Sequence, residues 1–175
     1  AENMPLSYRE NGIKRTIYLA FNAALNKIIQ KANADNESLE KYDTTLSLVV
    51  FNGVCLYYGH SGDGGIFGLT VYGDYVEITT PHKGSDGLSV IPLRMGEDTW
   101  TIDAYREELT SVLLVTDGVR DAIKPFTLGN GEKDVYVPIC SLLMHPSWFQ
   151  NHLADYKEIT QSFLGNQLNK NVQYQ

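Results

Sequence analysis

The chain has 175 residues, with 14 lysines and arginines against 21 aspartates and glutamates, so its net charge is −7. This acidic balance argues against nucleic acid as a partner, because neutralising phosphates needs a clustered basic surface. No apolar run approaches the roughly 20 residues of a membrane span, and residues 1–12 lack the basic start of a signal peptide. With 43% hydrophobic residues, we expect one packed, cytoplasmic domain with no membrane partner.

The first predicted element is an amphipathic helix. From Ile13 to about Ala32, apolar residues recur at spacings of three and four, which places them on one helix face. Residues 1–12 carry little pattern, and residues 166–175 form a polar tail. The sequence therefore predicts a folded domain over residues 13–165.

Two β-hairpins are predicted next, each made of two runs rich in β-branched and aromatic residues around a short turn signal. Asn52-Gly53 tolerates the positive φ angles of a type I′ turn, and Gly73-Asp74 suits a second tight turn. The runs are residues 44–51 and 54–60 in the first hairpin and residues 65–72 and 75–80 in the second.

The remaining segments predict a loop, one more strand and several helices. Residues 81–97 hold three glycines and two prolines, too many for a regular element, so we expect a loop or flap over the sheet. The continuous apolar run 112–115 predicts a strand covered on both faces. Helical patterns follow at residues 119–123, 135–144 and 152–164. Helix, antiparallel strands and then helices predict an α+β layered fold.

Three aspartates are the candidates for chemistry. Asp63 lies in a glycine-rich connection between two strands, where it could also close an Asx-type turn. Asp117 follows an apolar strand, and Asp121 lies four residues later, on the same side of the predicted helix. The alternative is that Asp117 is a helix N-cap and Asp121 a solvated surface charge. Two close carboxylates need a compensating cation or hydrogen bonds.

The chemistry of these side chains favours particular ions. Carboxylate oxygens suit Mg²⁺ or Mn²⁺, which keep several waters and use few protein ligands. The four histidines show no short-spaced pair, so zinc is not expected. Cys55 and Cys140 lie in apolar surroundings without the spacing of a redox or zinc site, which predicts buried free thiols.

Taken in order, these segments resemble the metal-dependent protein phosphatase 2C family. The stretch 113–121, Leu-Leu-Val-Thr-Asp-Gly-Val-Arg-Asp, is similar to the family's most recognisable motif, an apolar strand that ends Ser-Asp-Gly-Leu-x-Asp. Residues 61–64 look like its Gly-Asp-Ser turn, and Asp43-Thr44-Thr45-Leu46 looks like its small-residue strand start. Residues 80–84 resemble the segment that follows the second hairpin in bacterial members. The resemblance covers residues 13–164.

The resemblance implies an α–β–β–α sandwich of two antiparallel sheets. It also implies hydrolysis of phosphoserine and phosphothreonine in a phosphorylated protein substrate, by water activated with Mn²⁺ or Mg²⁺. Asp117 would then be a ligand of a two-metal centre, and Asp63 and Asp121 would join it at an additional, weaker site. In the flap, His82, Lys83 and Arg94 are candidates for contact with the substrate.

The chain departs from the family pattern at both ends. The family's early Asp-Gly pair is absent, since the first aspartate is Asp35, and no Asp-Asn or Asp-Asp strand follows Asp155. Losing these ligands should weaken cation binding, so the chain is expected to be an impaired phosphatase. Two explanations stay open. The chain is either a fragment that lacks edge strands at both ends, or a natural non-catalytic relative that binds a partner.

Overall fold

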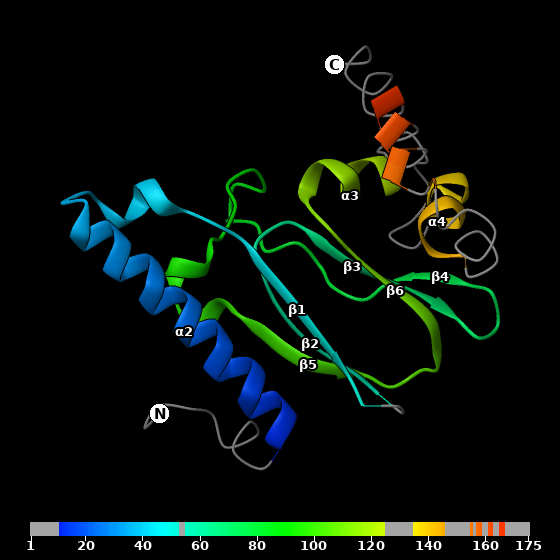
Figure 1. Ribbon diagram of the computed structural model, residues 1–175, viewed down its shortest axis with the longest axis horizontal. Coiled ribbons are helices and arrows are strands. Elements are labelled where there is room, and N and C mark those ends of the chain that lie inside the picture. Colours follow the sequence, from blue (N-terminus) through cyan, green and yellow to red (C-terminus); the bar gives the residue numbers. More distant parts are fainter. Residues whose placement is uncertain are drawn as a thin grey trace. The chain divides into compact units, whose positions relative to one another are not determined.

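The structure is a computed structural model, and it describes residues 11–52, 55–124 and 135–145, with single positions 155, 157, 158, 161, 162, 165 and 166. The chain forms two compact units (Figure 1). The first unit comprises Ala1–Asp63 and Pro81–Glu107, and the second comprises Gly64–Thr80 and Glu108–Gln175. Of the predicted helix at 152–164 and the polar tail at 166–175, most residues lie outside the described ranges.

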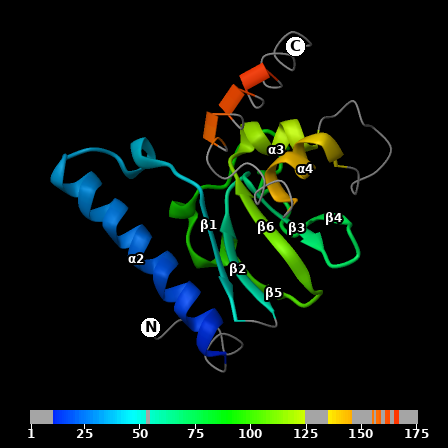
Figure 2. The same ribbon diagram turned by 45° about the vertical axis from the view of Figure 1, so that its right-hand side comes forward.

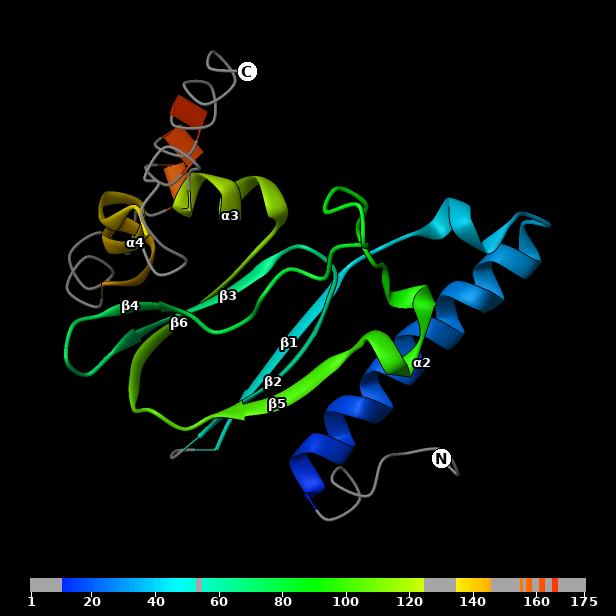
Figure 3. The ribbon, with the colours of Figure 1, turned by 180° about the vertical axis from the view of Figure 1, so that it is seen from behind.

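The first unit consists of a long helix on a three-stranded antiparallel sheet. Helix α2, Gly12–Ala34, lies along one face of the sheet, as Figure 3 shows from behind. The Asn11 side chain caps its first turn by accepting hydrogen bonds from the backbone N–H groups of Ile13 and Lys14. The short 3₁₀ helix Leu39–Tyr42 then leads into the sheet, whose strand order is β1 (Leu46–Phe51), β2 (Leu56–Ser61) and β5 (Thr101–Tyr105).

The core of the first unit lies between α2 and the sheet. Ile17 and Phe21 are fully buried there, and Trp100 packs edge-on against Phe21. A side chain at Gly59 would come within 2.6 Å of both Ile17 and Phe21. Glycine at this position therefore lets the helix approach the middle strand closely.

The second unit places two short helices on another three-stranded antiparallel sheet. Its strand order is β4 (Tyr75–Glu77), β3 (Gly65–Thr70) and β6 (Leu109–Val115), and its helices are α3 (Asp117–Ile123) and α4 (Val137–Met144). Both helices lie against this sheet (Figure 2). Phe67 of β3 is fully buried in one cluster with Ile123 of α3 and Ile139 of α4. Each sheet thus has its own hydrophobic core.

The predicted helix and the strand pairs of both hairpins are confirmed, but neither turn closes where it was predicted. Phe51 pairs with Leu56, so the first turn does not close at Asn52-Gly53 as predicted. The connection between the two strands is longer than two residues, and the Asn52 side chain closes it by accepting a hydrogen bond of 2.8 Å from the backbone N–H of Cys55.

In the second hairpin, Leu69 pairs with Tyr75, and the Thr70 N–H donates to the Asp74 carbonyl at 2.9 Å. The strands therefore do not meet directly across Gly73-Asp74. The two hairpins also belong to different sheets.

Two further expectations about strands and thiols need correction. Strand β5 was not predicted, and β6 is not covered on both faces, because Leu114 is 40% exposed. Cys140 is buried as expected, and its burial raises the thiol pKa to about 12, whereas Cys55 is only half-buried. The α+β class with two antiparallel sheets is confirmed, and no helix in the described ranges has the length and apolar character to cross a bilayer.

Candidate functional site

Asp63 is positioned by a glycine turn at the end of β2. Gly62 has a φ of 109°, and a Cβ atom there would lie 2.2 Å from the Thr45 side chain, so only glycine fits without a shift. The Gly62 carbonyl accepts a hydrogen bond of 2.8 Å from the backbone N–H of His82. The Asp63 carboxylate, nearly buried, binds the Lys83 ammonium with an Nζ–Oδ2 distance of 2.9 Å. The turn and the start of the flap are therefore joined by two contacts.

The flap, residues 81–97, is an ordered hairpin-like segment rather than a loose loop. Lys83 and Val90 form an antiparallel bridge, and the Gly84 N–H donates to the Ser89 carbonyl at 2.7 Å. Asp86 closes the tip by accepting hydrogen bonds from the backbone of Leu88 and from the backbone and hydroxyl of Ser89. The bonds from Ser89 lower the pKa of Asp86. The flap thus holds its shape through its own contacts.

The far end of the flap is tied to the segment before β1. The Leu93 N–H donates to the Thr44 carbonyl at 2.9 Å, and the Arg94 guanidinium binds both carboxylate oxygens of Asp43. This pairing raises the pKa of Arg94. In this structure the charge of Arg94, predicted to meet substrate, is matched by a carboxylate of the chain itself.

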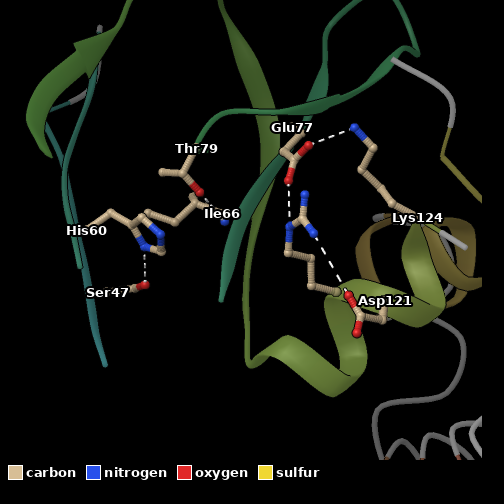
Figure 4. A network of polar contacts seen from close by, with 8 residues as sticks. Ser47, His60, Ile66, Glu77, Thr79, Asp121 and Lys124 are labelled. Atoms are coloured by element: carbon tan, nitrogen blue, oxygen red, sulfur yellow. Dashed lines mark hydrogen bonds and ion pairs between the residues drawn. The ribbon is translucent and has the colours of Figure 1, made fainter. Parts of the chain in front are cut away.

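His82 belongs to a row of polar side chains in which His60 is fully buried and the others are half-buried. On β1, β2 and β5, Ser47, His60 and Thr101 stand opposite one another. The Ser47 hydroxyl lies 2.9 Å from His60 Nδ1 (Figure 4), and the Thr101 hydroxyl lies 2.9 Å from His82 Nε2. The two imidazole rings meet edge to face with centroids 5.0 Å apart. Burial lowers the pKa of His82, so its neutral form is favoured.

Asp117 and Asp121 lie in the second unit and are both exposed. Asp117 is the first residue of α3, after the N-cap Thr116, and therefore is not itself the N-cap that the alternative interpretation assumed. The Asp121 side chain is 77% exposed, and one oxygen lies 3.8 Å from the Arg120 guanidinium. Both carboxylates are exposed and so accessible to a solvated cation, and the i to i+4 spacing places them on the same side of the helix.

Sequence reasoning missed a charged cluster around Glu77 of β4. Its two oxygens accept hydrogen bonds of 2.8 Å from Arg120 Nε and from Lys124 Nζ, the latter drawn in Figure 4. The three side chains are only 12%, 18% and 14% exposed. Because Glu77 precedes its partners by more than 40 positions, no local signal in the sequence could have found this cluster.

The donor set fits an oxygen-preferring cation only in part. Asp117 and Asp121 are exposed carboxylates of the kind that Mg²⁺ and Mn²⁺ bind through a mixture of protein oxygens and waters. Asp63, in the first unit, already holds an ammonium group. Within the described ranges, no group of three or more His, Cys, Asp or Glu side chains could hold a metal ion.

Comparison with known proteins identifies a family. The model of the family described as protein phosphatase 2C matches residues 4–163, which is most of the chain. Neither the curated proteins nor the solved structures gave a significant match. The family match includes Asp63, the flap and the Asp117 segment. The chain therefore belongs to the protein phosphatase 2C family.

Proposed function

We propose that the chain is a protein phosphatase 2C domain with impaired turnover, whose parent activity is hydrolysis of phosphoserine and phosphothreonine in proteins. The observation that carries this proposal is the pair of exposed carboxylates, Asp117 and Asp121, at the start of α3. They occupy the most specific motif of a chain that matches the family over residues 4–163. The family acts on phosphoproteins, which supports a protein substrate.

Asp117 and Asp121 would hold Mn²⁺ or Mg²⁺, and Asp63 would join them as a third ligand only when Lys83 does not occupy it. When bound, these ions supply an activated water nucleophile and neutralise phosphate charge. Asp63 is engaged by the Lys83 ammonium, and among the described residues no group of three or more His, Cys, Asp or Glu side chains could hold a metal ion. Fewer carboxylates mean less charge to offset dehydration of the cation, so weak metal binding and slow turnover are expected.

The predicted substrate contacts of the flap stay a prediction. His82, Lys83 and Arg94 each have a partner in the first unit, namely Thr101, Asp63 and Asp43. To bind a phosphate, each side chain would have to leave its partner or share it. Arg94 has the planar fork that suits phosphate best, but it is also the residue most fully matched by a carboxylate.

A second candidate is a non-catalytic binding or regulatory module on the same fold. One observation favours it: Leu88 is 82% exposed at the tip of a flap that is otherwise held closed by hydrogen bonds. An apolar side chain presented on an ordered loop suits contact with a partner protein. This alternative predicts no turnover at all.

Hydrolysis of an aryl phosphate and of a phosphothreonine peptide, measured against Mn²⁺ concentration, tests the proposal. We expect slow Mn²⁺-dependent turnover that Asp117→Asn lowers at least about tenfold, because it removes a ligand charge. Asp98→Asn, on the short helix Glu97–Thr99, is the matched control and should leave turnover unchanged. Fast turnover that Asp117→Asn abolishes would contradict impairment. Turnover that is absent at every Mn²⁺ concentration would favour the binding module.

A further inference from the structure

The contact between Lys83 and Asp63 has a consequence for metal binding. Lys83 Nζ lies 2.9 Å from Asp63 Oδ2, and the Asp63 side chain is only 11% exposed. A carboxylate so nearly buried needs a positive partner, because water reaches it poorly. In this chain that partner is an ammonium group from the flap.

The backbone on both sides holds the ammonium in position. On the acidic side, the Gly62 turn can adopt its φ of 109° only with glycine, and it accepts a hydrogen bond from the N–H of His82, the residue before Lys83. On the basic side, Lys83 itself forms the antiparallel bridge with Val90. The ion pair therefore joins two fixed segments, which reduces the side-chain entropy that an exposed pair would lose.

We propose that Lys83 is the resident cation of Asp63, so that a divalent ion reaches this carboxylate only when the flap lysine leaves it. The inference rests on the proposed function, since it concerns one of the three carboxylates assigned there to a cation. An ammonium within 3 Å offsets the charge that would attract Mn²⁺ and repels the ion itself. Docking of the flap and divalent binding at Asp63 exclude each other.

The contrast with the second unit supports this assignment. The exposed carboxylates Asp117 and Asp121 have no lysine partner among the described residues, and Arg120 is bound at close range to Glu77 instead. Lys83, by comparison, has Asp63 as its carboxylate partner. The three aspartates predicted to share a cation therefore differ in their surroundings: Asp63 is paired with an ammonium group, whereas Asp117 and Asp121 are exposed to solvent.

Mn²⁺ binding to the full chain, measured by calorimetry and by electron paramagnetic resonance of unbound Mn²⁺, tests the proposal without activity. Lys83→Met should lower the Mn²⁺ dissociation constant at least about tenfold, or should add a second Mn²⁺ site, because it removes a positive charge next to Asp63. Lys83→Met combined with Asp63→Asn should lose that gain. In the otherwise unchanged chain, Asp63→Asn alone should leave Mn²⁺ binding as it was.

Two control variants separate the local effect from net charge and folding. Lys41→Met removes a lysine that pairs with Glu37 on the surface, so it changes net charge equally and should not tighten Mn²⁺ binding. Lys83→Arg keeps the positive charge and should keep Mn²⁺ out, with circular dichroism to verify folding.

Two results would overturn the proposal: equal Mn²⁺ affinity in Lys83→Met and Lys41→Met, or weaker binding in Asp63→Asn alone. Failure of the proposed function is distinct, because it is read from turnover in Asp117→Asn.

Discussion

The candidate metal-binding aspartates of the two units are in opposite surroundings. In the first unit, Asp63 is nearly buried and paired with Lys83, and Asp43 is paired with Arg94. Basic side chains of the flap therefore neutralise both carboxylates. In the second unit, Arg120 and Lys124 both bind Glu77, and Asp117 is left exposed at the start of α3. The position of the basic residues, rather than of the acidic ones, decides which carboxylates stay available to an external cation.

This difference also bears on how the family motifs should be interpreted. Asp63 and Asp117 both lie in segments that resemble family motifs, yet only Asp117 is open to solvent. A motif fixes where a carboxylate sits on the backbone, but its chemistry depends on a partner that can come from a distant segment. The following predictions test the comparison, from the largest expected effect to the smallest.

The packing that supports the first unit should show the largest effect. Phe21→Ala removes a fully buried ring that packs on Gly59 of β2, so the free energy of unfolding should fall by about 3–5 kcal/mol. Leu19→Ala, on the exposed side of the same helix, should cost less than about 1 kcal/mol. Urea unfolding followed by circular dichroism measures both, and similar losses would show that α2 is not packed on β2 as described.

In the second unit, Glu77→Gln should break the cluster that Glu77 forms with Arg120 and Lys124. Arg120 and Lys124 would lose their common counter-charge in a largely buried place, at a cost of about 2–3 kcal/mol. The matched control, Asp121→Asn, neutralises an exposed carboxylate and should change stability by less than about 0.5 kcal/mol. Chemical denaturation at low salt gives both values, and an equal effect would refute the cluster.

The pH dependence of the stability of the first unit should report the half-buried His82. Burial lowers the folded-state pKa of His82 below its ordinary 6.5, so the unfolded chain takes up a proton more readily. The free energy of unfolding should therefore fall as pH drops through about 6.5 and stay level above it with respect to this group. His82→Asn should flatten that slope in urea midpoints between about pH 5 and 7. If the dependence of stability on pH were the same in His82→Asn, another group would be responsible for it.

Local patterns in the sequence predicted α2, both hairpins and the short helix after Thr116, because helical spacing and turn residues act over a few positions. They missed β5, whose five residues lie between the flap and a charged stretch and become a strand by pairing with β2. Continuous apolarity in β6 suggested cover on both faces, although Leu114 is 40% exposed. Tertiary pairing decided these elements.

For the candidate site, the sequence located the aspartates and the flap but not their partners. The contact of Lys83 with substrate stays a prediction, and no motif indicated its ion pair with Asp63, 20 residues earlier. The Glu77 cluster and the meeting of His60 with His82 likewise depend on contacts between distant segments. Such pairings follow from strand register and loop docking, which no short motif encodes.

A double-mutant cycle on Lys83 and Asp63 tests the central claim most directly. The unfolding free energies of Lys83→Met, Asp63→Asn and the double variant, measured without divalent ions, give the coupling between the two side chains. Because Asp63 is nearly buried and Lys83 only partly exposed, we expect a favourable coupling of about 1 kcal/mol that salt reduces. A coupling below about 0.2 kcal/mol would contradict the assignment of Lys83 as the cation that Asp63 holds.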